Sequence, residues 1–133
     1  MIEEVKKIPL NDQGARIMEG QAVKTEGYNE RYQKFIHTVA PYYDFDNNEP
    51  KPKVMAQCFD SIFTIVKKDG IKSISIPPIG TGFYGFPYLL YCEISFERVL
   101  HYLVSNPDLT QVTFLTNEPF LSEFFIYFYS QLL

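Results

Sequence analysis

The chain of 133 residues is long enough for one domain with a single buried core, and its 46% hydrophobic content is ordinary for a globular protein. Twelve basic and sixteen acidic residues give a formal net charge of −4, which disfavours general binding to nucleic acid, because such binding rests on clustered Lys and Arg. The charge does not exclude a small anion held by backbone amides. Twelve Phe and ten Tyr, without a Trp, predict a core built largely from rings.

Targeting and redox features indicate a soluble protein of the cytoplasm or nucleus, without a membrane partner. The N-terminal sequence MIEEVKKIPL lacks the apolar core of a signal peptide, and the most apolar run, FFIYFYSQLL, is too short to span a bilayer. The two cysteines, Cys58 and Cys92, fall in predicted helices. We therefore expect two buried thiols in a reducing compartment rather than a disulfide framework.

The first half of the chain predicts the end of a helix followed by two strands. Residues 2–8 have the character of the last turns of a helix, which a proline then stops. Residues 21–27 and 33–39 alternate or run apolar over strand length, with the turn-rich segment GYNER between them. Residues 41–52 predict an irregular segment.

The second half alternates helices and strands. Apolar residues recur at helical spacing over residues 54–66, and a glycine follows the basic end of this helix as a stop signal. We expect a strand at 71–76, a helix from Tyr88, a strand at 111–116 and a closing helix at 119–133. Such an order predicts an α/β fold with parallel strands and right-handed crossovers, in which ligands bind outside the carboxyl ends of the strands.

A glycine-rich loop, PPIGTGFYGFP at residues 77–87, lies at such a strand end. Gly80, Gly82 and Gly85 permit positive φ and the close backbone approach that an anion-binding loop requires. No Lys-Ser/Thr pair follows, so the loop is not a Walker loop. Its spacing fits G-x-G-x-x-G, but no βαβ unit with an acidic ribose ligand about 20 residues further on accompanies it.

Two interpretations of this loop remain open from the local sequence. Phe83 and Tyr84 stand between glycines, where their rings are suited to cover a sugar or a base. Alternatively, the segment is only the turn that joins a strand to a helix, and its aromatic side chains fold back onto the core. Glycine loops are weak motifs, so the loop alone does not decide between these interpretations.

Two segments together resemble macro domains, which are ADP-ribose-binding modules. SISIPPIGTGFYGFP resembles the second ligand loop of that family, and GQAVKTEGYNERYQKFIHTVAP resembles its strand pair G-E-A-x-x-T-x-G-y-n-L-x-x-K-x-V-I-H-T-V-G-P. The residues of the strand pair match in order and without gaps at Gly20, Ala22, Thr25, Gly27, Tyr28, Asn29, Lys34, Ile36, His37, Val39 and Pro41.

The resemblance implies a three-layer α/β/α fold with a mixed sheet and a defined set of site residues. Residues 1–133 would form a single, partial macro domain. Tyr84 would lie beside the distal ribose of the ligand, and Asn117 falls where many members carry an aromatic residue against the adenine. His37 matches a common family residue, which we interpret as structural. The diphosphate would be gripped by the backbone of Gly80, Thr81, Gly82, Phe83 and Gly85.

Other family elements have no counterpart in these 133 residues. They are an early Asp that reads adenine, an Asn-Ala-Asn segment and a Gly-rich first phosphate loop. The resemblance covers roughly the last two-thirds of a macro domain, so we expect a chain that lacks the family's first strands. Family members that hydrolyse ADP-ribosyl bonds draw their water-positioning residues from these missing elements. We therefore expect no catalytic residues and no turnover in this chain.

The leading expectation is a binding module for ADP-ribose or an ADP-ribosylated protein, weakened by the missing elements. The alternatives are an incomplete ADP-ribosyl hydrolase and a degenerate domain that only mediates protein interactions. We expect no cofactor and no metal, because the histidines lack metal-spaced partners and Asp44–Asn48 lacks the later glycine and glutamate of a calcium loop. An exposed sheet edge could also support self-association.

Overall fold

The computed structural model describes residues 6–10, 14, 17–27, 31–42, 50–82 and 84–132. Each predicted strand and each helix from residue 54 onward is confirmed within a few residues. The expected N-terminal helix lies largely outside the described residues, although Lys6 is helical. The elements are β1 (Ala22–Glu26), β2 (Lys34–Thr38), α2 (Pro52–Lys68), β3 (Ser73–Ile76), α3 (Tyr88–Ser105), β4 (Gln111–Phe114) and α4 (Pro119–Ser130).

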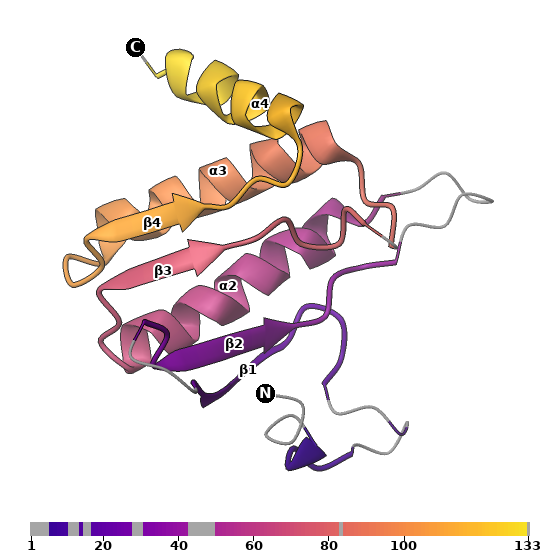
Figure 1. The fold of residues 1–133 in the computed structure, drawn as a ribbon, viewed down its shortest axis with the longest axis vertical. Helices are drawn as coiled ribbons and strands as arrows, with labels where there is room; N and C mark the ends of the chain where they lie inside the picture. The colour runs from indigo at the N-terminus through magenta and orange to yellow at the C-terminus, as the bar shows by residue number, and fades with distance from the viewer. Residues whose placement is uncertain are drawn as a thin grey trace.

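Among the residues that the structure describes, four strands form two pairs, and no strand pairing connects one pair with the other (Figure 1). Strands β1 and β2 are antiparallel, and β3 and β4 are parallel with α3 as the connection between them, as the β/α order predicts. Gly70, with φ of 62°, follows α2 and provides the expected helix stop before β3.

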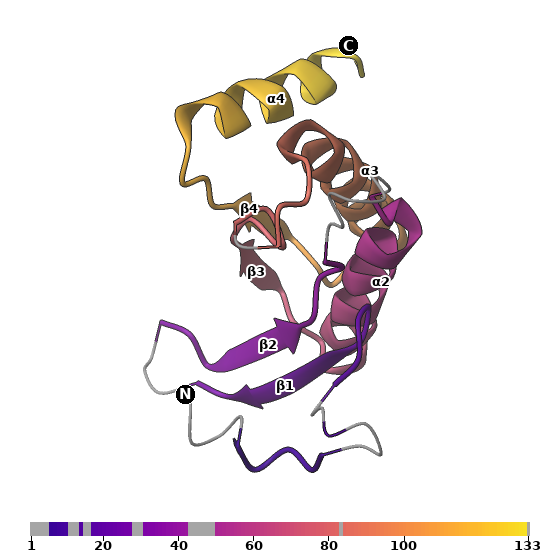
Figure 2. The same ribbon diagram turned by 90° about the vertical axis from the view of Figure 1, so that its right-hand side faces the viewer.

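The helices lie on one side of the strands. Figure 2 shows α2 and α3 packed side by side against the strand pairs, with α4 beside α3. Asp60 of α2 joins these two helices, because its Oδ1 accepts hydrogen bonds from Arg98 Nη2 (2.6 Å) and from the Tyr102 hydroxyl (2.7 Å) of α3. The arrangement confirms the predicted α/β fold class. The described helices form one layer and the described strands two separate pairs, so the second helix layer and the single mixed sheet that the resemblance implies are not seen among the described residues.

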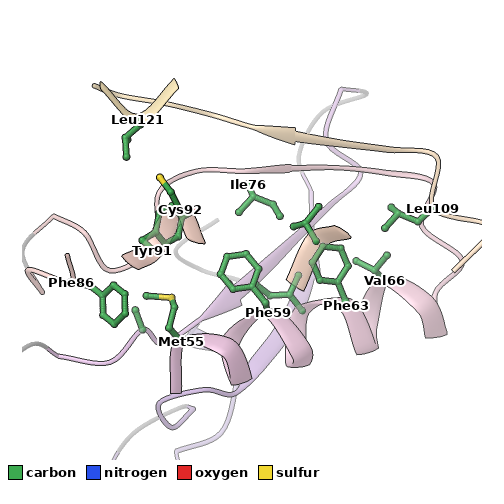
Figure 3. Packing of buried hydrophobic residues seen from close by; sticks show 13 residues of the cluster. Met55, Phe59, Phe63, Val66, Ile76, Phe86, Tyr91, Cys92, Leu109 and Leu121 are labelled. Carbon is green, nitrogen blue, oxygen red and sulfur yellow. The ribbon is translucent and has the colours of Figure 1, made fainter. Parts of the chain in front are cut away.

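The core between strands and helices is built from rings, as the composition predicts (Figure 3). Phe59 and Phe63 of α2 contact rings from α3: Phe59 lies 6.2 Å from Tyr91 between centroids, and Phe63 stacks on Tyr102 at 4.8 Å. The largest fully buried side chains are those of Tyr91, Phe59, Phe63, Phe86, Met55 and Leu121.

Both thiols are buried and free, which confirms the expectation for Cys58 and Cys92. The spacing of Leu89 in the sequence fits an apolar face of α3, but its side chain is 51% exposed. The stripe that faces the core instead contains Tyr91, Cys92, Ser95 and Val99.

Helix α4 buries Leu121 and packs Phe124, Phe125 and Phe128 against the core. Leu132 lies beyond the end of the helix at Ser130, and its side chain is exposed. Within the described residues, no helix combines the length and the apolar character needed to cross a membrane.

Candidate functional site

The glycine loop lies where the sequence predicts it, between the carboxyl end of β3 and the start of α3. The first residue of the loop is anchored to α3, because the Tyr91 hydroxyl donates a hydrogen bond to the Pro77 carbonyl at 3.1 Å. Burial raises the pKa of Tyr91, so the phenol stays protonated and remains a donor. Phe86, near the other end of the loop, is buried beside Met55 (Figure 3).

Two internal hydrogen bonds fold the loop into a compact turn. The Phe86 amide donates to the Gly80 carbonyl (2.8 Å), and the Gly85 amide donates to the Gly82 carbonyl (3.0 Å). Gly80 and Gly85 have φ of 71° and 70°, which favour glycine. We also expected a positive φ at Gly82, but its φ lies outside the left-handed region.

The loop rests on the end of β2. A Cβ added at Gly80 would lie 2.7 Å from the Cβ of Ala40 and 3.4 Å from Cε of Met55. Apart from its chain neighbours, no atom of the described residues would lie within 4 Å of a Cβ added at Gly82. Gly80 is therefore required by packing within the chain, whereas the space in front of Gly82 is open.

Three consecutive amides of the loop have no hydrogen-bond acceptor among the described residues. The N–H groups of Gly80, Thr81 and Gly82 donate no hydrogen bond within the part of the chain that the structure describes. Helix α3 begins directly after the loop, with Pro87 at its N-cap and no side-chain cap. The uncapped amides of its first turn add partial positive charge at the same end of the sheet.

Two exposed tyrosines meet beside these amides. The rings of Tyr42 and Tyr84 pack edge to face with centroids 5.7 Å apart, and they are 51% and 38% exposed. Glu19 accepts a hydrogen bond from the Tyr42 amide (3.4 Å) and pairs with Lys51 Nζ (3.5 Å). Sequence reasoning missed Tyr42, although it directly follows the matched segment FIHTVAP.

Asn117 lies at the same edge of the sheet, after β4. The Leu115 amide donates to the Ile76 carbonyl (2.9 Å), so the pairing of β3 and β4 continues up to the loop. Phe120 of α4 then packs edge to face on Tyr88 of α3, with centroids 5.0 Å apart. Asn117 is exposed between these contacts. Phe83, the remaining predicted site residue, lies outside the described residues.

His37 and Cys58, which the sequence also offers as chemically active side chains, have the surroundings of structural residues. His37 is partly buried and shares a hydrogen bond of 2.8 Å with the Thr25 hydroxyl, and burial lowers its pKa. Burial likewise raises the pKa of the Cys58 thiol. No group of three potential metal ligands occurs among the residues that the structure describes. Asp44–Asn48 lies outside them.

The fold and the loop define a class of α/β proteins that keep an open glycine loop between a parallel strand and a helix. The chain belongs to the macro domain family, whose sequence pattern it matches over residues 1–94. It is 31% identical over 106 residues to an O-acetyl-ADP-ribose deacetylase of Cronobacter turicensis, covering 80% of this chain and 60% of that protein. It is 33% identical over 87 residues to an ADP-ribose glycohydrolase of Homo sapiens, covering 65% of this chain and 20% of that protein.

Solved structures confirm the macrodomain fold. An Oceanobacillus iheyensis macrodomain with ADP matches with a TM-score of 0.79 at 24% identity, covering 90% of this chain and 62% of that one. A Trypanosoma brucei macrodomain in complex with ADP-ribose matches with a TM-score of 0.76 at 23% identity, covering 87% and 47%. The chain spans 60% and 58% of two bacterial deacetylases that it matches.

Proposed function

We propose that this chain binds ADP-ribose, free or attached to a protein, with the diphosphate on the amides of Gly80, Thr81 and Gly82. The observation that carries the proposal is that these three N–H groups have no partner in the described part of the chain, while the space at Gly82 is open. Consecutive free amides suit phosphate oxygens, and the adjacent start of α3 favours negative charge.

The remaining loop residues have distinct roles in this proposal. Gly85 shapes the loop through its positive φ, because its own amide is already donated to Gly82. Phe83 contributes its amide to the diphosphate, as the family resemblance implies. Tyr84, steadied by Tyr42, covers the distal ribose, and Asn117 offers a polar group to the edge of the adenine.

The relatives support the ligand class. Their names include deacetylation of O-acetyl-ADP-ribose and hydrolysis of ADP-ribose linkages, and solved macrodomains hold ADP or ADP-ribose. Because the described site draws its free amides from one loop, we expect weaker binding than a ligand enclosed by two loops would have. A cytoplasmic or nuclear location, where proteins carry ADP-ribosyl groups, belongs to the same proposal.

Hydrolysis is the second candidate, and it is favoured only by the names of the relatives. The loop at residues 77–87 contains no Asp, Glu, His or Cys, which are the side chains that most often act as general base or nucleophile beside a ligand. A domain that mediates protein contacts without ligand is the third candidate. A release assay on an ADP-ribosylated protein should show no turnover, and measurable release would restore the enzyme interpretation.

Titration calorimetry with ADP-ribose separates binding from a ligand-free role. The wild-type chain should release heat, and Gly82→Val should abolish it, because the added side chain fills the space proposed for the diphosphate, where the described residues beyond the chain neighbours place no atom within 4 Å of the Cβ. The matched control is Gln111→Val, which places the same side chain at the exposed amino end of β4. Absence of heat from the wild-type chain at millimolar ligand, or equal binding by both variants, would contradict the proposal.

A further inference from the structure

The carboxyl ends of β4, β3 and β2 lie at the same side of the molecule, where the glycine loop is found (Figure 1). Asn117 follows β4, the loop follows β3, and Tyr42 follows β2. The contact of Gly80 with Ala40 joins the ends of β3 and β2. In the proposed function the adenine lies at Asn117 and the diphosphate on the loop. The distal ribose therefore extends toward Tyr84 and Tyr42, at the end of β2.

Glu19 connects this end of the site to the start of α2. Its Oε1 accepts a hydrogen bond from the Tyr42 amide at 3.4 Å, and its Oε2 lies 3.5 Å from Nζ of Lys51, the N-cap residue of α2. The Tyr42 ring in turn packs edge to face on Tyr84, with centroids 5.7 Å apart. A continuous series of contacts therefore runs from Lys51 through the Glu19 carboxylate to the two rings.

The backbone that carries Glu19 is fixed independently of these contacts. The next amide, that of Gly20, donates to the Val39 carbonyl (2.9 Å), and the Ser61 hydroxyl of α2 donates to the Gly20 carbonyl (2.5 Å). Gly20 has a φ of 82°, and a Cβ added to it would lie 2.9 Å from Oε1 of Gln57. The turn is therefore anchored to β2 and to α2, and removal of the Glu19 carboxylate leaves these anchors in place.

The contacts of the Glu19 carboxylate are too exposed to be a major source of folding stability. The side chains of Glu19 and Lys51 are 37% and 52% exposed, and Tyr42 is 51% exposed. Exposed ion pairs of this kind contribute little to the free energy of unfolding. Their effect is instead local, because a fixed neighbour reduces the side-chain entropy that an exposed ring loses when it becomes ordered around a ligand.

We infer that Glu19 is a positioning residue that makes the site selective for ligands with a second ribose beyond the diphosphate. The carboxylate fixes the backbone of Tyr42, the Tyr42 ring positions the ring of Tyr84, and Tyr84 covers the distal ribose. Glu19 acts through the two tyrosines and does not itself contact the ligand. The inference rests on the proposed function, because it requires the diphosphate on the loop amides.

Two other roles of Glu19 would affect binding differently. A carboxylate that acts on the diphosphate through space repels it, so its removal would tighten the binding of every diphosphate ligand alike. A carboxylate that is needed only for folding would, on removal, weaken the binding of every ligand alike. A positioning role separates ligands that carry the distal ribose from ligands that lack it.

Calorimetric titration with ADP-ribose and with ADP, which has the diphosphate but no distal ribose, distinguishes these roles. Glu19→Ala should weaken ADP-ribose binding about threefold, because the Tyr42 amide loses its charged acceptor, and should leave the affinity for ADP unchanged. Glu19→Gln keeps an oxygen acceptor for this amide and should restore most of the affinity for ADP-ribose. Glu97→Ala, which removes an exposed carboxylate of α3, is the control and should change neither affinity.

A double variant shows whether Glu19 acts through Tyr42. In a chain that already carries Tyr42→Ala, adding Glu19→Ala should cause no further loss of ADP-ribose affinity, because residues that act through one another give non-additive effects. If Glu19→Ala does not fold, Glu19→Asp, whose shorter side chain withdraws the carboxylate from the Tyr42 amide, takes its place.

The two ligands also separate failure of this inference from failure of the proposed function. Additive losses in the double variant, equal changes for ADP and ADP-ribose, or unchanged ADP-ribose binding by Glu19→Ala would each overturn the inference. Wild-type binding of ADP in any of these cases would leave the proposed diphosphate site standing. A wild-type chain that binds neither ligand would overturn the inference and the proposed function together.

Discussion

Gly80 and Ala40 are in such close contact that a Cβ on Gly80 would lie 2.7 Å from the Cβ of Ala40. This contact joins the glycine loop after β3 to the end of β2, two segments that share no strand pairing. The loop is therefore positioned by packing as well as by its own two hydrogen bonds. The three loop amides that we propose as ligands of the diphosphate are positioned by this support.

The first prediction concerns this contact. Gly80→Ala should destabilise the fold by about 1–3 kcal/mol, because the methyl group overlaps Ala40 and the residue has a positive φ. Urea unfolding would measure the loss. Adding Ala40→Gly removes the overlap but not the backbone strain, so the double variant should recover part of the effect of Gly80→Ala. Strictly additive losses would show that the two residues do not interact.

The second prediction concerns the ring pair at the site. Tyr84→Ala should weaken ADP-ribose binding about tenfold, or about 1.4 kcal/mol, because it removes the ring proposed to cover the ribose. Tyr42→Ala should weaken binding less, since Tyr42 acts by holding Tyr84. Tyr129→Ala, which removes an exposed ring from α4, is the control. Equal affinities for the Tyr84 and Tyr129 variants would exclude a role for the pair.

The third prediction concerns the support beneath the loop. Tyr91→Phe removes the hydroxyl that donates to the Pro77 carbonyl and should cost about 1 kcal/mol of unfolding free energy. Thermal unfolding would report the change. Tyr127→Phe, at an exposed position of α4, should leave stability unchanged. Identical stabilities of both variants would mean that the hydrogen bond does not anchor the loop.

The fourth prediction concerns pH. Asp69, at the end of α2, accepts hydrogen bonds from Lys24 (2.7 Å) and Lys34 (3.3 Å) of the β1–β2 pair, and that from Lys24 is the main cause that lowers its pKa below 3.8. A lowered folded-state pKa adds stability above the unfolded value, and this stability is lost as the pH falls through the folded value.

Urea unfolding of Asp69→Asn across a pH series checks this linkage. The wild-type chain should be more stable than the variant at neutral pH, and the difference should shrink as the pH falls below 3.8 and through the lowered folded-state pKa of Asp69. Asp108→Asn, which changes an exposed carboxylate, is the control. A difference that stays constant over the whole pH range would contradict the linkage.

Local sequence patterns predicted the helices and strands well, because the residues that start and stop these elements lie next to them in the chain. The proline before Tyr88 and the glycine at position 70 bound helices in the sequence and in the structure. The position of the glycine loop followed from the β/α order alone. The resemblance to ADP-ribose-binding domains required a second segment, residues 20–41, which is distant from the loop in the sequence. In the fold the two segments meet, because Ala40, just after β2, contacts Gly80 of the loop.

The sequence did not predict relationships that depend on tertiary packing. Tyr42 falls in a segment without periodicity, so nothing local paired it with Tyr84. Leu89 fits a helical apolar face, but the rotation of α3 about its axis, which turns Tyr91 and Cys92 to the core, leaves it exposed. The amide of Gly85 was expected at the diphosphate because a glycine spacing does not reveal internal hydrogen bonds.

The central claim is that three backbone amides hold the diphosphate, and amide chemical shifts test it most directly. Nuclear magnetic resonance spectra of the ¹⁵N-labelled chain should be recorded during titration with ADP-ribose, and with ribose as a ligand without phosphate. The account predicts that the largest shifts occur at the amides of Gly80, Thr81 and Gly82, and that ribose does not produce them. Binding of ADP-ribose that leaves these three resonances unchanged, or no binding at all, would contradict the account.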